Sequence, residues 1–273
     1  MPLDFLAVGH LTVDRLESGC RLGGAAAYSA ITAHRLGLRA GIVTSVGAEF
    51  PFFAELEGIE IHNATGEATT VFENTYRENV RSQRLLGRAA SLDQSHLARV
   101  RVTEEAAVLY CPVVDEVRMP LDRLAPRGLS GVAAQGFFRQ WDEKGRVTVR
   151  DWPDAADALS RADFVCLSED DAEPQDELAA RFPGIAWVVT RGAGGCRVHA
   201  RGAFLDFPAF PANVVDPTGA GDVFAAAFLI ALKENMPLPL AARFASGAAA
   251  IVVEGMGTSS IPCRAEVEAR IGR

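Results

Sequence analysis

The sequence predicts an α/β fold in which helical crossovers join the strands of a parallel sheet. Residues 5–9 form a short apolar run that ends in glycine, which is typical of a strand buried on both faces. Residues 25–36 follow as an alanine-rich helical stretch that Gly37 ends, and residues 40–46 are apolar again. Because strand, helix and strand alternate in this way, parallel pairing is favoured.

The same alternation resumes after residue 90 and continues toward the carboxyl end. Further buried strands are expected at 108–111, 132–135, 164–167 and 187–190. Helices are expected at 154–161, 174–181, 220–233 and 240–253. Because no repeat, low-complexity tract or linker divides the chain, residues 1–273 are predicted to form a single domain.

Residues 64–90 break this rhythm. Segments 69–76 and 81–86 alternate apolar and polar residues around a polar turn, which indicates a hairpin with one exposed face. We expect residues 10–22 and 64–90 to form a small β-lid inserted in the main body. Since the exposed strand edges of such a lid need cover, a homodimer through the lid is expected.

Composition argues against several classes of protein. The chain has 27 Lys and Arg against 35 Asp and Glu, a formal charge of −8, which disfavours a nucleic-acid partner. Apolar runs fall short of the roughly 18 residues of a membrane span, and the amino terminus lacks a signal-peptide pattern. Five dispersed cysteines without a C-x-x-C pair fit reduced thiols better than disulfides or zinc. A cytoplasmic enzyme without nucleic-acid or membrane partners is the expected class.

The motif with the clearest chemistry is DPTGAGD at residues 216–222, directly before a helical stretch. Its small residues let the backbone approach a ligand, and the helix start presents free N–H groups. Gly219, Ala220 and Gly221 are therefore suited to hold an anion such as a transferring phosphoryl group. Asp222, in the first turn, is suited to accept the proton of a substrate hydroxyl. The alternative is that Asp222 only complements the helix dipole and the glycines only form a turn.

A second motif, at residues 188–196, runs from a strand through a glycine-rich turn into another strand. Such a loop lets a nucleotide lie against the backbone, although a plain β-turn has the same composition. The chain has no G-K-[ST] sequence, so a P-loop does not hold the phosphates.

A third feature lies near the amino terminus, where Asp14 precedes the pair Gly23 and Gly24. These residues are suited to meet a polyhydroxylated substrate. The alternative is that Asp14 is an ordinary solvated turn residue.

In order and spacing, the three features resemble the ribokinase-like (PfkB) carbohydrate kinase family, and the resemblance covers nearly the whole chain. Residues 216–228 resemble the carboxyl-terminal signature of the family, residues 23–37 the amino-terminal one, and residues 190–195 (TRGAGG) the ATP loop. The resemblance implies a ribokinase-like three-layer sandwich, with helices on both faces of a mostly parallel central sheet and a β-lid. It also implies phosphoryl transfer from MgATP to an alcohol.

The resemblance further implies roles for particular residues. Asp222 would be the base and residues 219–221 the anion hole, while Asp14, Gly23 and Gly24 would face the acceptor.

For the donor, the implied contacts are Thr190, Gly192 and Gly195 of the ATP loop. Ser246 lies in the run 240–250, which is similar to the helix that flanks the adenine. Asp216 and Thr218 occupy places consistent with a loop that binds a monovalent cation such as K⁺.

The chain departs from the family pattern at two places and retains it only in part at a third. Residues 168–171 (SEDD) replace the usual N-x-x-E motif, so Ser168 stands beside the nucleotide and Asp171 would reach Mg²⁺ through water. Tyr28 stands where asparagine is common, which changes reach and hydrogen bonding. Arg139 is retained from a D-x-N-x-R-like run, where it either holds an anionic part of a ligand or pairs with a nearby acid.

The acceptor stays open among a sugar, a polyol of the inositol kind and a nucleoside. A rival interpretation, motivated by Ser168 and Tyr28, is a non-catalytic sensor that binds nucleotide or sugar and retains the kinase fold. A dinucleotide-dependent oxidoreductase is disfavoured, because the first strand is not followed by G-x-G-x-x-G.

Overall fold

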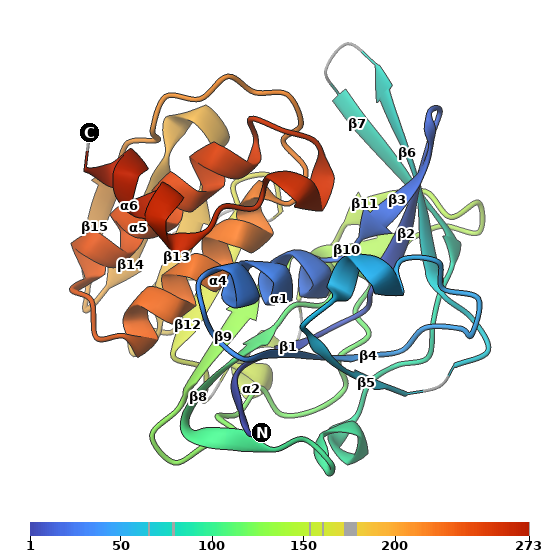
Figure 1. The fold of residues 1–273 in the computed structure, drawn as a ribbon, viewed down its shortest axis with the longest axis horizontal. Helices are drawn as coiled ribbons and strands as arrows, with labels where there is room; N and C mark the ends of the chain where they lie inside the picture. Colours follow the sequence, from blue (N-terminus) through green and yellow to red (C-terminus); the bar gives the residue numbers. More distant parts are fainter. Residues whose placement is uncertain (65, 78–79, 153, 160, 172–178, 273) are drawn as a thin grey trace.

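The computed structural model describes residues 1–64, 66–77, 80–152, 154–159, 161–171 and 179–272. Its centre is a nine-stranded sheet (Figure 1). The strands are, in spatial order, β15 (Ala203–Phe207), β14 (Cys196–Ala200), β13 (Ala186–Thr190), β12 (Phe164–Ser168), β9 (Leu129–Ala133), β8 (Val102–Tyr110), β1 (Leu3–Val8), β4 (Ala40–Thr44) and β5 (Glu60–Asn63). The strands from β13 to β5 pair in parallel, whereas β14 and β15 add an antiparallel hairpin at one edge.

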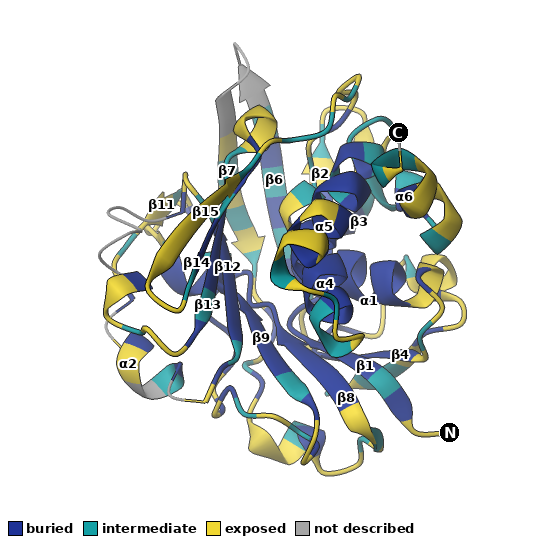
Figure 2. Ribbon diagram, turned by 90° about the vertical axis from the view of Figure 1, so that its left-hand side faces the viewer, coloured by how far each residue is buried: buried dark blue, intermediate teal, exposed yellow. Residues whose placement is uncertain are grey.

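Helices cover both faces of this sheet, so the α/β sandwich predicted from the sequence is confirmed (Figure 2). One face carries α1 (Ala25–Arg35), α4 (Ala220–Lys233), α5 (Leu238–Val252) and α6 (Arg264–Ile271). The other face carries the short α2 (Ala155–Ala158) and irregular segments. Single 3₁₀ turns lie between these elements, at Phe53–Leu56 (η1), Gln94–Leu97 (η2), Ala134–Phe138 (η3), Gly192–Gly194 (η4) and Gly257–Ser260 (η5).

Each face of the sheet has its own apolar core, because neighbouring residues of a strand point to opposite sides. In β1, Phe5 belongs to the core under α1, α4 and α5, while Leu6 belongs to the core on the α2 side. Both side chains are fully buried. A strand that is buried on both faces therefore needs apolar residues on both sides, as β1 has at residues 5–8.

Alanine-rich surfaces let α1 and α4 pack closely. Ala26, Ala27 and Ala30 of α1 are fully buried, as are Ala225 to Ala227 of α4. Small side chains shorten the distance between helix axes, so the start of α4 lies against α1.

A second, four-stranded sheet projects from the body (Figure 1). Its order is β3 (Gly19–Gly23), β2 (Thr12–Leu16), β6 (Thr70–Arg77) and β7 (Val80–Gly87), and we call it the small sheet. A two-stranded ribbon, β10 (Arg139–Trp141) with β11 (Val147–Val149), meets β7 through the bridge between Arg84 and Arg146.

Several predicted bounds were wrong. The strand expected at 132–135 ends at Ala133, because residues 134–138 turn into η3. The helix expected at 154–161 is the single turn α2, and the one expected at 174–181 lies mostly outside the described residues. The ribbon β10–β11, the edge strand β15 and helix α6 were not predicted, since their sequences are short, polar or both. In the part of the chain that is described, the model has no helix long and apolar enough to cross a membrane.

Candidate active site

The sequence-predicted motifs meet at the carboxyl edge of the main sheet. Strands β1, β8, β9, β12 and β13 end there, and the chain then enters the loops that carry the motifs. This edge is where α/β sheets bind their ligands.

The start of α4 forms the centre of the site. Gly219 caps the helix in the left-handed conformation, with φ 79°, and its carbonyl accepts the first helical hydrogen bond from the Val223 N–H at 2.9 Å. The N–H groups before Val223 lie in the first turn, where helices have no helical acceptors for them. The Ala220 N–H reaches the Pro217 carbonyl only at 3.4 Å. The turn therefore presents backbone donors and the positive end of the helix dipole to a partly open space.

Asp222 lies in this first turn and is partly exposed. Burial is the main cause that raises the pKa of two thiols, Cys111 after β8 and Cys166 in β12, and the negative charge of Asp222 adds to both. The Asp222 carboxylate is thus close to the strand ends, beside the backbone donors of residues 219–221.

Tyr28 of α1 lies directly under this turn. A methyl group added at Gly219 would overlap the Tyr28 ring, so only glycine fits there both sterically and in φ. Burial is the largest cause that raises the pKa of Tyr28, and the charges of Asp216, Asp222 and Asp14 add to it. The negative charges of all three carboxylates therefore act on one phenol. The Tyr28 hydroxyl is fully buried and has no hydrogen-bond partner among the described residues.

Asp216 holds the loop that leads into α4. It is buried, and its carboxylate accepts hydrogen bonds from the N–H groups of Thr218 (3.0 Å) and Gly257 (3.3 Å). Burial opposes its ionisation, but the Thr218 contacts and the charge of Arg21 outweigh burial and hold the pKa of Asp216 below its ordinary value.

Arg21 of the small sheet reaches this loop. Its Nη1 donates to Asp216 Oδ2 at 2.6 Å and its Nη2 donates to Thr218 Oγ1 at 2.9 Å. Arg21 was not predicted from the sequence, because an arginine on an alternating strand looks like any solvated residue.

Asp14 and Gly23 lie together, as the motif suggested. Asp14 is buried on β2, where its carboxylate accepts from the Thr12 hydroxyl at 3.0 Å. A methyl group at Gly23 would lie 2.5 Å from Asp14 Oδ1. Gly24, with φ 97°, caps α1 against the His10 carbonyl. Asp14 is therefore no solvated turn residue, and Gly23 leaves room for its carboxylate.

A second buried carboxylate, Glu116, fixes the loop after β1. It accepts hydrogen bonds from the N–H groups of His10, Val113 and Val114 at 2.8–3.1 Å. Glu116 is fully buried and ties the chain after β1 to the chain after β8. It was not predicted from the sequence, because its partners are backbone groups and the distant one, His10, belongs to another segment.

The glycine-rich loop lies farther along the same edge. Thr190 ends β13 opposite Ser168, which ends β12. Gly192 begins η4 and Gly195, with φ 86°, follows it where any side chain would overlap the Phe207 carbonyl. Ser246 of α5 is buried and forms a hydrogen bond with the Cys196 thiol, whose pKa burial raises to about 11. The loop is thereby joined to α5.

Asp171 follows β12 and is buried. Its carboxylate accepts from the Ser168 N–H at 2.8 Å and from the Gln135 amide at 3.0 Å. No cluster of three or more metal-ligating side chains occurs among the described residues. A site for Mg²⁺ does not need one, because this ion commonly keeps several waters and takes one or two carboxylates plus substrate phosphates. A hard oxygen donor such as Asp171 at this edge fits that mode.

Arg139 begins β10. It donates to the Val113 carbonyl at 3.2 Å and its guanidinium lies 5.9 Å from the centre of the Phe72 ring in β6. It therefore links the β10–β11 ribbon to the small sheet.

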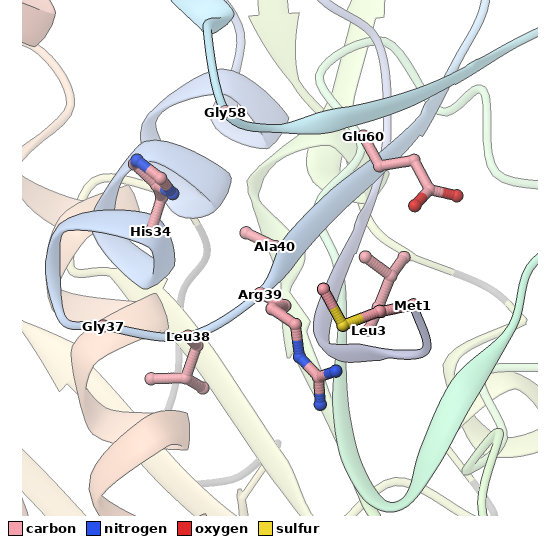
Figure 3. A pocket seen from close by; sticks show the side chains of 9 residues that line it. All are labelled: Met1, Leu3, His34, Gly37, Leu38, Arg39, Ala40, Gly58 and Glu60. Atoms are coloured by element: carbon pink, nitrogen blue, oxygen red, sulfur yellow. The ribbon is translucent and has the colours of Figure 1, made fainter.

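One hollow of the surface lies elsewhere. A cavity of about 420 Å³ is lined by Leu3, Ala40 and Glu60, at the amino ends of β1, β4 and β5, together with His34 and Arg39 (Figure 3). It lies at the sheet edge opposite the motifs and contains none of the predicted site residues. The carboxyl edge therefore remains the candidate active site.

Comparison with known proteins agrees with this geometry. Residues 133–264 match the model of the pfkB family carbohydrate kinases. A cytidine kinase of Thermococcus kodakarensis is 28% identical over 287 residues, which cover 95% of this chain and 99% of that protein. An inositol 3-kinase of Arabidopsis thaliana is 27% identical over 247 residues, 86% of this chain and 68% of that protein.

A solved structure shows the same fold. It is a pyrophosphate-dependent kinase of the ribokinase family complexed with a pyrophosphate analogue and myo-inositol, with a TM-score of 0.80. It is 23% identical, and the match covers 97% of this chain and 99% of that one.

Fold and site together define a phosphotransferase that acts on an alcohol group. Residues 133–264 carry the pfkB family carbohydrate kinase match, and the curated and structural relatives are kinases of the ribokinase family, as the resemblance of the motifs implied.

Proposed function

We propose that this protein transfers the γ-phosphoryl group of ATP to a hydroxyl of a small sugar, an inositol-like polyol or a nucleoside. The observation that carries the proposal is the start of α4. There a carboxylate, Asp222, lies in the first turn beside backbone donors, Gly219 of the same turn lies against Tyr28, and the buried Asp14 lies on β2 beside Gly23. A base and an anion hole on one side and a hydroxyl-binding carboxylate on the other are what phosphoryl transfer to an alcohol requires.

In the proposed reaction, Asp14 accepts hydrogen bonds from acceptor hydroxyls, with Gly23 and Gly24 leaving room for the ligand. The acceptor oxygen bonds to the γ-phosphorus as the bond from that phosphorus to the ADP oxygen breaks. The hydroxyl proton passes to the Asp222 carboxylate. The N–H groups of residues 219–221 stabilise the negative charge on the phosphoryl oxygens, and the helix dipole adds to this effect.

The small sheet is the proposed lid. Its strands β2 and β6 carry Asp14 and Phe72, both buried, so the sheet both binds the acceptor and shields it. Excluding water matters here, because water is the competing acceptor. Arg139, next to Phe72, is proposed to line the acceptor side.

We propose ATP as the donor, because a ribokinase of Arabidopsis thaliana with the same fold is complexed with ATP and the chain has a loop resembling the ATP loop. In this chain we assign its binding to Thr190, Gly192 and Gly195, with Ser246 on the adenine side and Ser168 beside the phosphates. Asp171 would hold Mg²⁺ through water, and the ion would neutralise phosphate charge when bound. The free thiols of all five cysteines support a reducing, cytoplasmic setting.

The test is acceptor-dependent formation of ADP. The protein is incubated with MgATP and, separately, with myo-inositol, ribose, fructose and cytidine, and pyrophosphate replaces ATP in a parallel series. We expect ADP to form with one acceptor class and not without it. Binding of ATP and acceptor with no turnover by any pair would instead support the sensor that keeps the kinase fold.

We further propose a homodimer through the small sheet. Strand β3 is at its edge, with exposed residues Gly19 and Cys20, while the other edge strand, β7, is bridged to the β10–β11 ribbon. An uncovered edge strand favours pairing with a second copy. A monomeric mass in solution at the protein concentration of the assay would contradict this proposal.

A further inference from the structure

The guanidinium group of Arg21 lies beside the loop of residues 216–219, at the place where a bound cation would contact that loop. Arg21 projects from β3 of the small sheet, and its two terminal nitrogens donate to Asp216 and Thr218, 195 and 197 residues later in the chain. The side chain is only 17% exposed and that of Asp216 only 7%. The short contact of 2.6 Å between charged, largely buried groups is the strong, charge-assisted kind.

Both oxygens of the Asp216 carboxylate accept hydrogen bonds from the protein. Oδ1 accepts the Thr218 N–H, and Oδ2 accepts both Arg21 and the Gly257 N–H. The Thr218 hydroxyl, the other oxygen that a metal cation could take, accepts from Arg21 as well. A K⁺ ion at Asp216 and Thr218 would thus compete with a positive charge already bonded to both. The donor set does not fit an added monovalent cation while Arg21 is in this position.

The same contacts act on the anion hole. Thr218 directly precedes Gly219, the left-handed residue on which α4 begins, and Gly219 lies against Tyr28. Fixing Asp216 and Thr218 from outside therefore fixes where the N–H groups of residues 219–221 point. Arg21 also faces Asp14 across the β2–β3 pair, so one hairpin carries both the acceptor-binding carboxylate and the cation of the loop.

We propose that Arg21 is a built-in cation of the catalytic loop: a positioning residue that orients the anion hole and makes the kinase independent of K⁺. This inference rests on the proposed function. It further predicts that the orientation of the anion hole depends on the β2–β3 hairpin, because removing Arg21 frees both ends of the contact.

The experiment compares the wild type with Arg21→Met, which keeps the length of the side chain and removes its charge, and with Arg21→Lys. Arg15→Met is the matched control, because Arg15 is exposed on the same hairpin. Acceptor-dependent turnover is measured in KCl, in NaCl and in tetramethylammonium chloride at equal ionic strength. The wild type and Arg15→Met should turn over equally in all three salts.

Arg21→Met should lose about 100-fold in kcat in tetramethylammonium chloride, as expected for a disordered oxyanion hole. Adding K⁺ or guanidinium ions should then raise the kcat of Arg21→Met about tenfold. A merely structural role of Arg21 would not give this rescue. Arg21→Lys should keep an intermediate kcat. The melting temperature gives a second readout without catalysis: it should rise with KCl for Arg21→Met and stay constant for the wild type.

Two outcomes would overturn the inference. One is activation of the wild type by K⁺ severalfold over tetramethylammonium. The other is a raised acceptor KM in Arg21→Met with kcat unchanged and no rescue, which would make Arg21 an acceptor ligand. If the wild type turns over no acceptor at all, the proposed function fails, while the melting temperatures still decide whether Arg21→Met opens a cation site.

Discussion

The two sides of the active site are built differently. The turn that starts α4 is held by packing between helices, with Gly219 against the fully buried Tyr28 and alanines of α1 against alanines of α4. The small sheet is held by strand pairing and has exposed residues along β3 and β7. Close-packed interiors resist displacement, whereas a projecting sheet has fewer buried contacts to lose when it moves. The proposed phosphoryl transfer would use this division, with the proposed base and anion hole fixed while the proposed lid opens and closes over the acceptor.

The largest expected effect is a loss of kcat on substitution of Asp222, at the start of α4. Asp222→Asn keeps the shape of the side chain but removes the carboxylate that would accept the proton. We expect kcat to fall by about 10³-fold, within the range for loss of a general base. Titration with ATP measures whether the donor still binds, and it should. A kcat near that of the wild type would remove Asp222 from the role of base.

The second largest effect is expected from the packing of the α4 start against the Tyr28 ring. Gly219→Ala introduces a strained φ of 79° and an overlap with the Tyr28 ring, so the free energy of unfolding should fall by about 3 kcal/mol. Gly221→Ala is the control, because a methyl group there meets open space, and its stability should change by less than about 0.5 kcal/mol. Urea unfolding measures both. Equal stabilities would mean that packing does not hold this turn.

On the small sheet, a glycine-to-alanine substitution should lower the stability less and should weaken acceptor binding. Gly23→Ala brings a methyl group to 2.5 Å from Asp14 Oδ1, and the carboxylate must shift. We expect the acceptor KM to rise about tenfold while the KM for ATP stays constant. Gly184→Ala, exposed and with no atoms near its methyl group, should leave both unchanged. A rise in the ATP KM alone would place Asp14 on the donor side.

The smallest expected effect is on pH dependence, at the contact that joins the two sides. The folded-state pKa of Asp216 lies below its ordinary value of 3.8, so its ionised form stabilises the folded protein above that pH. This contribution is lost as the pH falls through the folded-state pKa. Asp216→Asn should therefore be less stable at pH 7, by about 1 kcal/mol, and should lose less stability below pH 4 than the wild type does. Urea unfolding between pH 3 and 7 checks both; parallel pH curves would contradict the ion pair.

Much of the fold could be predicted because its signals are local. The apolar run at residues 5–9 and the alanine-rich stretches 25–36 and 220–233 correspond to β1, α1 and α4. The edge strand β15 is exposed although four of its five residues are apolar, so a run this short did not distinguish a strand from a loop. The ribbon β10–β11 is formed by only three residues on each side, too few to show a period.

By itself, the sequence determined where the chemistry lies along the chain. Glycine at 219 and 221 and aspartate at 222, before an apolar helix, already define a helix start that presents N–H groups beside a carboxylate, because capping and dipole depend on near neighbours. Only the tertiary structure decided what holds that helix start in place. Arg21 meets Asp216 across 195 residues, and Glu116 binds the backbone of His10 across 106. A polar residue on a strand or in a loop carries no local sign of such a partner, since the contact exists only when the sheets bring the two segments together.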